Sequence, residues 1–196
     1  MNKLIVIVGA SGVGKTTLAN ALCKTEKFAI AYEQHAERPF QSLFKLDSKY
    51  ALANQMDYLL FRAEQELELR QSKLPALIDG GLDLDFHGFT RLFHTRGLLN
   101  DDEYNLCRRF YFHTRSLLPP PELVIALSAD AQTISERLAS RNRINIASSE
   151  DAGLLEEYVN EWLESIPESN VLKLNVSKEN AEYSHSIPII LDKIRL

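Results

Sequence analysis

A glycine-rich segment, GASGVGKT at residues 9–16, carries the clearest chemistry in the chain. It follows the apolar run at 4–8 and precedes TLANALCK, which has a helical pattern. In the pattern G-x-x-x-x-G-K-[ST], glycines let successive backbone N–H groups turn inward around phosphate oxygens. We predict binding of ATP with Mg²⁺, with Lys15 at the terminal phosphates and the Thr16 hydroxyl on the metal. The predicted nucleotide-binding residues are Gly9, Ala10, Ser11, Gly12, Val13, Gly14, Lys15, Thr16 and Thr17.

Two carboxylates come directly after apolar runs typical of buried strands. Glu33 follows AIAY, and Asp79 ends ALID. Because ligands of open α/β sheets bind beyond the carboxyl ends of the strands, both carboxylates should lie on the side of the phosphate loop. One can accept the proton of an attacking hydroxyl, and the other can hold Mg²⁺. The alternative is that both only cap the helices that follow.

Three arginines, Arg137, Arg141 and Arg143, lie close together in SERLASRNR. Arg137 and Arg141 share one face of a helix, and guanidinium groups at that spacing suit a phosphoryl group whose charge must be neutralised during transfer. The alternative is that they complement the dipole at a helix C-terminus. Beside a phosphate loop we favour a catalytic lid over about residues 137–150.

The elements that position these residues follow from the hydrophobic pattern. Short apolar runs at 4–8, 28–32, 76–78, 123–127 and 171–176 alternate with segments of helical period at 51–71, 101–117, 133–141 and 154–163. Strands that alternate with helices form parallel sheets covered on both faces. The sequence therefore predicts a three-layer α/β fold of the P-loop kinase type, with a five-stranded parallel sheet in a single domain, residues 1–196.

Composition excludes several other classes of protein. The net charge of −5 argues against a protein that binds nucleic acid regardless of sequence. Cys23 and Cys107 are the only cysteines, too few for a disulfide framework, and a reducing cytoplasm is the simplest setting. The apolar start LIVIVGA is too short to span a membrane. We expect a cytoplasmic protein that acts on a small molecule.

Several further segments resemble, in order, those of the deoxynucleoside kinase family, which phosphorylates the 5′-hydroxyl of deoxynucleosides. DSKYALANQMDYLLFR resembles D-P-x-R-[YW]-A-F-x-x-Q-x-Y-F-L-x-x-R, DGGLDLDFHGF lies where the family has [DE]-R-S-x-x-x-D-x-x-x-F, and RLASRNR matches its lid, R-x-x-x-R-x-R. The segment LNVSKENAEY resembles the loop at the donor adenine. The resemblance implies a homodimer, with Glu33 as general base, Asp79 at the metal, Gln55 and Asp85 on the nucleobase and Arg62 as a second substrate arginine.

The chain departs from the family pattern where the acceptor binds. Gly80 replaces an arginine that holds the 5′-oxygen and phosphate, Phe44 replaces a tyrosine at the sugar 3′-hydroxyl, and Ile146 replaces an acid at the same hydroxyl. The leading hypothesis is an ATP- and Mg²⁺-dependent kinase that acts on the 5′-hydroxyl of a (deoxy)nucleoside. The alternatives are a kinase for a nucleoside monophosphate or a non-nucleoside alcohol, and a nucleotide-binding protein without turnover.

Overall fold

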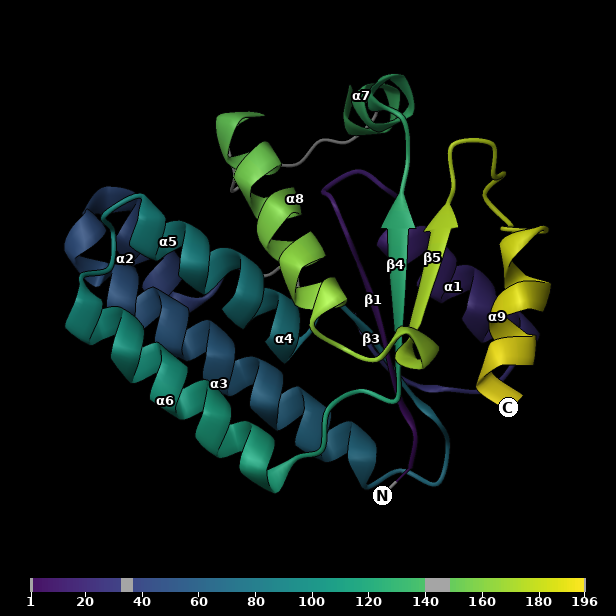
Figure 1. Ribbon diagram of the computed structural model, residues 1–196, viewed down its shortest axis with the longest axis horizontal. Coiled ribbons are helices and arrows are strands. Elements are labelled where there is room, and N and C mark those ends of the chain that lie inside the picture. Colours follow the sequence, from purple (N-terminus) through teal and green to yellow (C-terminus); the bar gives the residue numbers. More distant parts are fainter. Residues whose placement is uncertain (1, 33–36, 140–148, 196) are drawn as a thin grey trace.

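The computed structural model describes residues 2–32, 37–139 and 149–195. Its strands form one parallel sheet in the order β2-β3-β1-β4-β5 (Figure 1). The strands are β1 (Leu4–Gly9), β2 (Ala29–Ala31), β3 (Ala76–Asp79), β4 (Leu123–Ser128) and β5 (Val171–Asn175). The predicted five-stranded parallel sheet is therefore confirmed.

Helices cover both faces of this sheet. The helices of the described chain are α1 (Lys15–Thr25), α2 (Pro39–Leu46), α3 (Ala51–Arg70), α4 (Leu82–Leu84), α5 (Arg91–Thr95), α6 (Asp101–Leu117), α7 (Ala131–Ala139), α8 (Ser149–Glu164) and α9 (Ser186–Arg195), with the π-helix η2 (Asp85–Thr90) and the 3₁₀ turns η1 (Ser48–Tyr50) and η3 (Glu168–Asn170). Of the predicted lid, residues 137–139 end α7 and residues 149–150 begin α8; residues 140–148 lie outside the described chain.

The central strand β1 is buried on both faces, and its side chains alternate between two cores. Ile5 and Ile7 pack with α1 and α9, whereas Val6 packs with Val159 and Trp162 of α8. Figure 1 shows α8 and α9 on either side of the sheet. Because β1 is fixed from both sides, the loop that follows it has a rigid base.

A second body of helices, α2 to α6, extends from the β3 side of the sheet (Figure 1). Asn100 caps α6, and its side chain accepts from the Glu103 N–H at 3.0 Å while the Glu103 carboxylate accepts from the Asn100 N–H at 2.9 Å. The segment from α4 through η2 to α5 is continuous helix that the apolar pattern did not indicate. It is fixed by tertiary packing, since Phe86 stacks on Tyr111 of α6 with ring centroids 4.1 Å apart.

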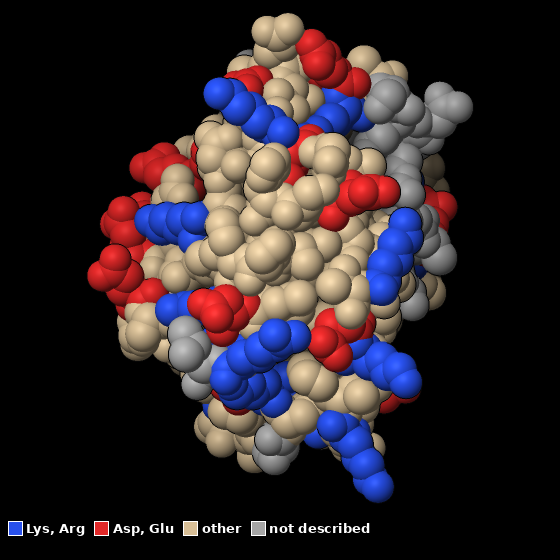
Figure 2. All heavy atoms as spheres, turned by 90° about the vertical axis from the view of Figure 1, so that its right-hand side faces the viewer, with Lys and Arg blue, Asp and Glu red and all other residues tan. Residues whose placement is uncertain are grey.

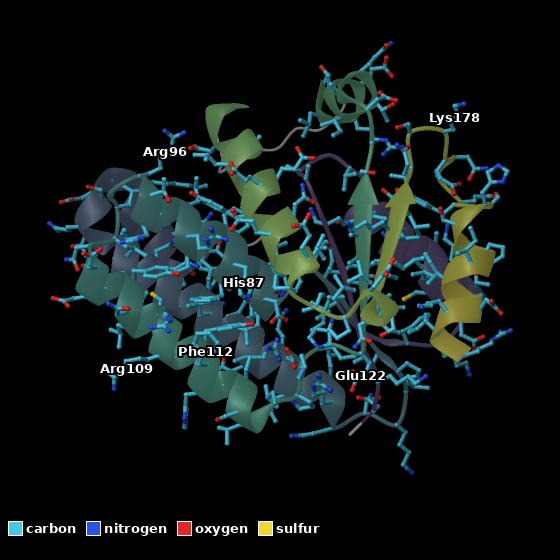
Figure 3. All side chains as sticks on the ribbon, viewed as in Figure 1. His87, Arg96, Arg109, Phe112, Glu122 and Lys178 are labelled. Atoms are coloured by element: carbon cyan, nitrogen blue, oxygen red, sulfur yellow. The ribbon has the colours of Figure 1, made fainter. Side chains whose placement is uncertain are left out.

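A buried ionic network holds this helical body together. Arg115 of α6 donates to Glu66 of α3 at 2.8 Å and to Asp83 of α4 at 2.7 Å. Arg70 also donates to Glu66, at 2.9 Å. His87, labelled in Figure 3, lies next to the network. Burial lowers the pKa of His87 to about 4, so this histidine is neutral at pH 7. Removing one member would leave a buried charge without compensation, so the network fixes α4 relative to α3.

The surface of the described chain carries both signs of charge. Figure 2 shows lysines, arginines and acidic residues interspersed around a largely uncharged centre on the side of α9. None of the helices in residues 2–32, 37–139 and 149–195 is long and apolar enough to cross a membrane.

Candidate active site at the carboxyl ends of the strands

The phosphate loop joins β1 to α1 in the conformation that its glycines permit. Gly14 has φ +109°, and a Cβ atom there would lie 2.1 Å from the hydroxyl oxygen of Tyr183. That hydroxyl donates to the Gly14 carbonyl at 3.0 Å, and Tyr183 is buried. Only glycine tolerates both this backbone region and this close approach. Tyr183, at the end of the LNVSKENAEY segment, thus stabilises the phosphate loop through a contact from a separate part of the chain.

Lys15 and the N-terminus of α1 together give this loop the groups that an anion site needs. The Lys15 ammonium donates to the carbonyls of Gly9 at 3.0 Å and Ala10 at 3.3 Å, which places it within the loop. Helix α1 begins at Lys15, and Gly14 before it makes no side-chain cap. Unfilled N–H groups at a helix start and an adjacent ammonium are what bind a polyphosphate.

Arg137 contacts the phosphate loop from α7. Its guanidinium donates to the carbonyl of Val13 at 2.5 Å and to that of Val176, just after β5, at 3.0 Å. Arg137 therefore joins the loop to the end of β5, an arrangement that the sequence pattern did not indicate. The other predicted lid arginines, Arg141 and Arg143, lie outside the described residues.

Asp79 and Thr16, the two predicted metal ligands, meet beside the loop. Asp79 pairs with Ile7 in the sheet and is fully buried, and it accepts a hydrogen bond from the Thr16 hydroxyl at 2.6 Å. A carboxylate and a hydroxyl at a phosphate site fit Mg²⁺, which binds through few protein oxygens together with phosphate oxygens and water. The donor set is therefore compatible with the predicted metal.

Strand β2 ends at the same edge as Asp79. Ala31 pairs with Ile78, and Tyr32 follows it. Burial raises the pKa of Tyr32, and the negative charges of the Cys23 thiolate, present only at high pH, and of Asp79 raise it further. The chain therefore reaches the edge of the site at Tyr32; Glu33 comes next and lies outside the described residues, as does Ile146.

Gln55 and Asp85, predicted to read a nucleobase, and Arg62, predicted as a second substrate arginine, are brought together on one side of α3. Arg62 donates to the Asp85 carboxylate at 2.8 Å, and the Gln55 amide nitrogen donates to the Asp85 backbone carbonyl at 3.2 Å. All three side chains are buried. A Cβ atom at Gly80 would lie 3.9 Å from a guanidinium nitrogen of Arg62, so this cluster lies directly beside the end of β3.

Phe44 lies in an aromatic group between α2 and α5. Its ring is tilted against that of Phe93, with centroids 5.2 Å apart. It lines a small pocket of about 100 Å³ together with Arg96 and Asp151, which form an ion pair at 2.7 Å. Figure 3 shows Arg96 at the end of α5 near α8.

Two further residues of this site were not identified from the sequence alone. Asp83 accepts hydrogen bonds from Tyr111 at 2.7 Å and Arg115 at 2.7 Å, and so anchors the start of the segment that carries Asp85. Thr90 contacts both Gln55 and Asp85. Neither residue belongs to a sequence motif. Each makes a hydrogen bond with a residue far away in the chain, and a pattern of neighbouring residues does not reveal such a contact.

The parallel sheet and the phosphate loop, with a carboxylate beside it, define a P-loop kinase-like α/β protein. Within that class the chain belongs to the deoxynucleoside kinase family, whose model matches residues 5–194. It is 23% identical over 200 residues to the deoxyadenosine/deoxycytidine kinase of Bacillus subtilis (strain 168), covering 98% of this chain and 92% of that protein. It is 29% identical over 140 residues to the deoxyadenosine kinase of Dictyostelium discoideum, covering 71% of this chain and 57% of that protein.

Solved structures agree on the fold. The deoxyadenosine kinase from M. mycoides with bound dATP superposes with a TM-score of 0.75 at 21% identity, covering 98% of this chain and all of that one (100%). The same kinase with bound dCTP gives a TM-score of 0.76 at 21% identity, with 98% of each chain covered. At this level of identity the likeness establishes the architecture, and the reaction has to be argued from the residues.

Proposed function

We propose that this protein transfers the terminal phosphoryl group of ATP to the 5′-hydroxyl of a (deoxy)nucleoside, with Mg²⁺. The observation that carries the proposal is that Asp79, beside the phosphate loop, and the Gln55–Arg62–Asp85 cluster adjoin across Gly80. A phosphoryl donor and a planar acceptor bound at these two places would meet at the end of β3. The curated relatives are named as kinases of deoxyadenosine and deoxycytidine, which supports this acceptor class.

Each residue has a part in this proposal. The loop amides and Lys15 bind the triphosphate, and Thr16 and Asp79 hold Mg²⁺, which offsets the negative charge of the phosphates. Glu33 accepts the proton of the acceptor hydroxyl. Arg137 shapes the loop, and Arg141 and Arg143 neutralise the phosphoryl group as it moves. On the acceptor side, Gln55, Arg62 and Asp85 contact the ring, and Phe44 contributes an apolar wall.

We also propose that the protein is a cytoplasmic homodimer. Leucines Leu60 and Leu67 of α3 and the side chains of Leu106 and Phe112 of α6 are exposed, and each is more than two-fifths accessible. Figure 3 shows Arg109 on the outer side of α6 and labels Phe112 on the same helix. Helices α3 and α6 thus offer apolar area to a second copy. A monomeric mass by light scattering at micromolar concentration would refute the dimer.

Screening acceptors with ATP and Mg²⁺ tests the proposed reaction. We expect phosphorylation of at least one of deoxyadenosine, deoxyguanosine, deoxycytidine and thymidine, at a rate below the roughly 1–100 s⁻¹ typical of kinases. The reason is Gly80, which gives the 5′-oxygen neither charge nor a hydrogen bond. The readouts are ADP formation and the mass of the phosphorylated product.

The same screen separates the alternatives. A product from a nucleoside monophosphate or a non-nucleoside alcohol, with none from the four deoxynucleosides, would replace the acceptor and keep the kinase. Tight ATP binding with no ADP from any acceptor would identify a nucleotide-binding protein without turnover.

Restoring an arginine at position 80 is expected to cost stability and to leave the rate without a gain. Gly80 has φ +89°, where a side chain costs roughly 1–2 kcal/mol, and the new guanidinium would meet that of Arg62. The melting temperature of Gly80→Arg should fall by about 2–8 °C. Gly80→Ala is the matched control, because it carries the backbone strain without the charge. A tenfold faster phosphorylation of deoxyadenosine by Gly80→Arg alone would show instead that the 5′-hydroxyl site is intact and lacks only this cation.

A further inference from the structure

Two carbonyl groups of the phosphate loop are held by side chains from other parts of the chain. The Tyr183 hydroxyl donates to the carbonyl of Gly14 at 3.0 Å, and Arg137 donates to the carbonyl of Val13 at 2.5 Å. We propose that Tyr183 is a positioning residue for the donor phosphates, and that with Arg137 it sets the direction of the loop N–H groups that receive them. This inference rests on the proposed function and concerns its donor side.

The geometry of the peptide group turns a contact on one side of the loop into an orientation on the other side. In a trans peptide the C=O bond and the N–H bond of the next residue point in opposite directions, and no peptide bond of the described residues is cis. Holding the Gly14 carbonyl therefore fixes the direction of the Lys15 N–H. Holding the Val13 carbonyl fixes the direction of the Gly14 N–H in the same way.

The start of α1 shows where the Lys15 N–H is directed. The Gly14 carbonyl also accepts from the N–H of Leu18 at 2.9 Å, so it points along the helix. The N–H on the other side of that peptide group, on Lys15, points out of the helix start, where anions bind. The Tyr183 hydroxyl thus stabilises the orientation that a phosphate oxygen needs.

Tyr183 has a feature that a residue of the hydrophobic core alone does not require. Its ring packs in the same core cluster as Val13 and Ile187, a role that phenylalanine could fill. Among the described residues, however, it is the only non-glycine residue with a positive φ, at 52°. This backbone region is unfavourable for a side chain of this size, and such residues persist where surrounding contacts hold them, often at functional sites.

The two contacts also join the phosphate loop to both ends of one segment after β5. Val176 and Tyr183 are buried, whereas residues 177–182 between them are exposed or half-buried, and Figure 3 labels Lys178 among these. Arg137 donates to the Val176 carbonyl at 3.0 Å as well as to the loop, and Tyr183 holds the loop from the other end of the segment. A shift at either end would therefore turn the N–H groups of the loop.

The test removes one oxygen atom, in Tyr183→Phe, and measures the binding of inorganic tripolyphosphate with Mg²⁺ by calorimetry. Tripolyphosphate carries the phosphates of ATP without its base, so its affinity depends on the loop. We expect the dissociation constants of tripolyphosphate and of ATP to rise by the same factor, about three- to tenfold, as for the loss of one hydrogen bond between neutral groups. The KM for ATP should rise likewise, whereas the dissociation constant of deoxyadenosine should stay unchanged.

Tyr158→Phe is the matched control. Tyr158 is also a buried tyrosine, and its hydroxyl forms a hydrogen bond with that of Thr95 at 2.8 Å, between α8 and α5. Its affinity for tripolyphosphate should equal that of wild type. A merely structural role of the Tyr183 hydroxyl would lower the melting temperature and leave the binding of tripolyphosphate unchanged, and that result would overturn the inference.

The remaining outcomes also decide the question. If wild type binds neither tripolyphosphate nor ATP, the inference is wrong. If ATP is bound but no acceptor is phosphorylated, the proposed function fails, and the comparison with tripolyphosphate still decides the role of Tyr183. If Tyr183→Phe does not fold, Arg137→Lys makes the same comparison, because it keeps the positive charge but lacks the fork of N–H groups that reaches two carbonyls.

Discussion

Lys15→Ala is expected to lower phosphoryl transfer from ATP by about 10³-fold or more and to leave the fold unchanged. In the proposed reaction the lysine supplies the positive charge nearest the terminal phosphates. The shape of the loop does not depend on it, because Gly14 and Tyr183 fix the backbone and the Lys15 ammonium contacts only main-chain carbonyls in the described structure. Transfer from γ-labelled ATP to the best acceptor of the screen measures the loss, and circular dichroism with a melting curve measures the fold.

Lys24→Ala is the matched control, since Lys24 is an exposed lysine in the last turn of the same helix. It should transfer phosphate at the wild-type rate. If Lys15→Ala also keeps the wild-type rate, the loop is not where the donor phosphates bind, and the assignment of the site is wrong.

Glu33→Gln is expected to lower turnover by roughly 10²–10⁴-fold with little change in ATP affinity. An amide of the same size cannot take the proton of the acceptor hydroxyl, whereas the phosphate loop and the Thr16–Asp79 pair are untouched by the change. Single-turnover transfer measures the chemical step, and calorimetry with ATP measures the affinity. The rate should remain low across the pH range in which the wild type is active.

Glu37→Gln provides the comparison for Glu33→Gln. Glu37 is exposed and pairs at the surface with Lys45 at 2.5 Å, a kind of contact that contributes little. Its rate should equal that of wild type. A collapse of ATP binding in Glu33→Gln would instead assign Glu33 to the metal or to the fold and leave the general base to be found elsewhere.

The sequence was sufficient for the sheet because the sheet depends on local patterns, and the prediction of the donor side of the site rests on patterns of the same kind. Short apolar runs separated by helical segments predict parallel strands, and residues that follow such strands must lie at one edge. The spacing of glycines before Lys15 predicts the loop, and the position of Asp79 at a strand end predicts that it lies on the side of the loop. In the structure Asp79 accepts a hydrogen bond from Thr16 at 2.6 Å.

The acceptor side was decided by tertiary contacts. Gln55, Arg62 and Asp85 were expected from a resemblance of motifs, but their mutual hydrogen bonds join α3 to a π-helix that no periodicity in the sequence indicates. Arg137 was expected at the phosphates, and in the structure its guanidinium donates to the carbonyls of Val13 in the loop and of Val176 after β5.

The sheet could be predicted and the contacts around Gln55 could not, because the first depends on local preferences of the chain and the second on contacts between distant segments. A turn or a buried strand is selected by the conformational freedom and polarity of adjacent residues. These properties follow directly from the types of consecutive residues in the sequence. The direction of the Gln55 amide depends on Thr90, 35 positions away, and the place of Asp83 depends on Arg115, 32 positions away. Such pairs form only when packing brings distant segments together and excludes water, so only the tertiary structure decides which donors and acceptors remain for a ligand.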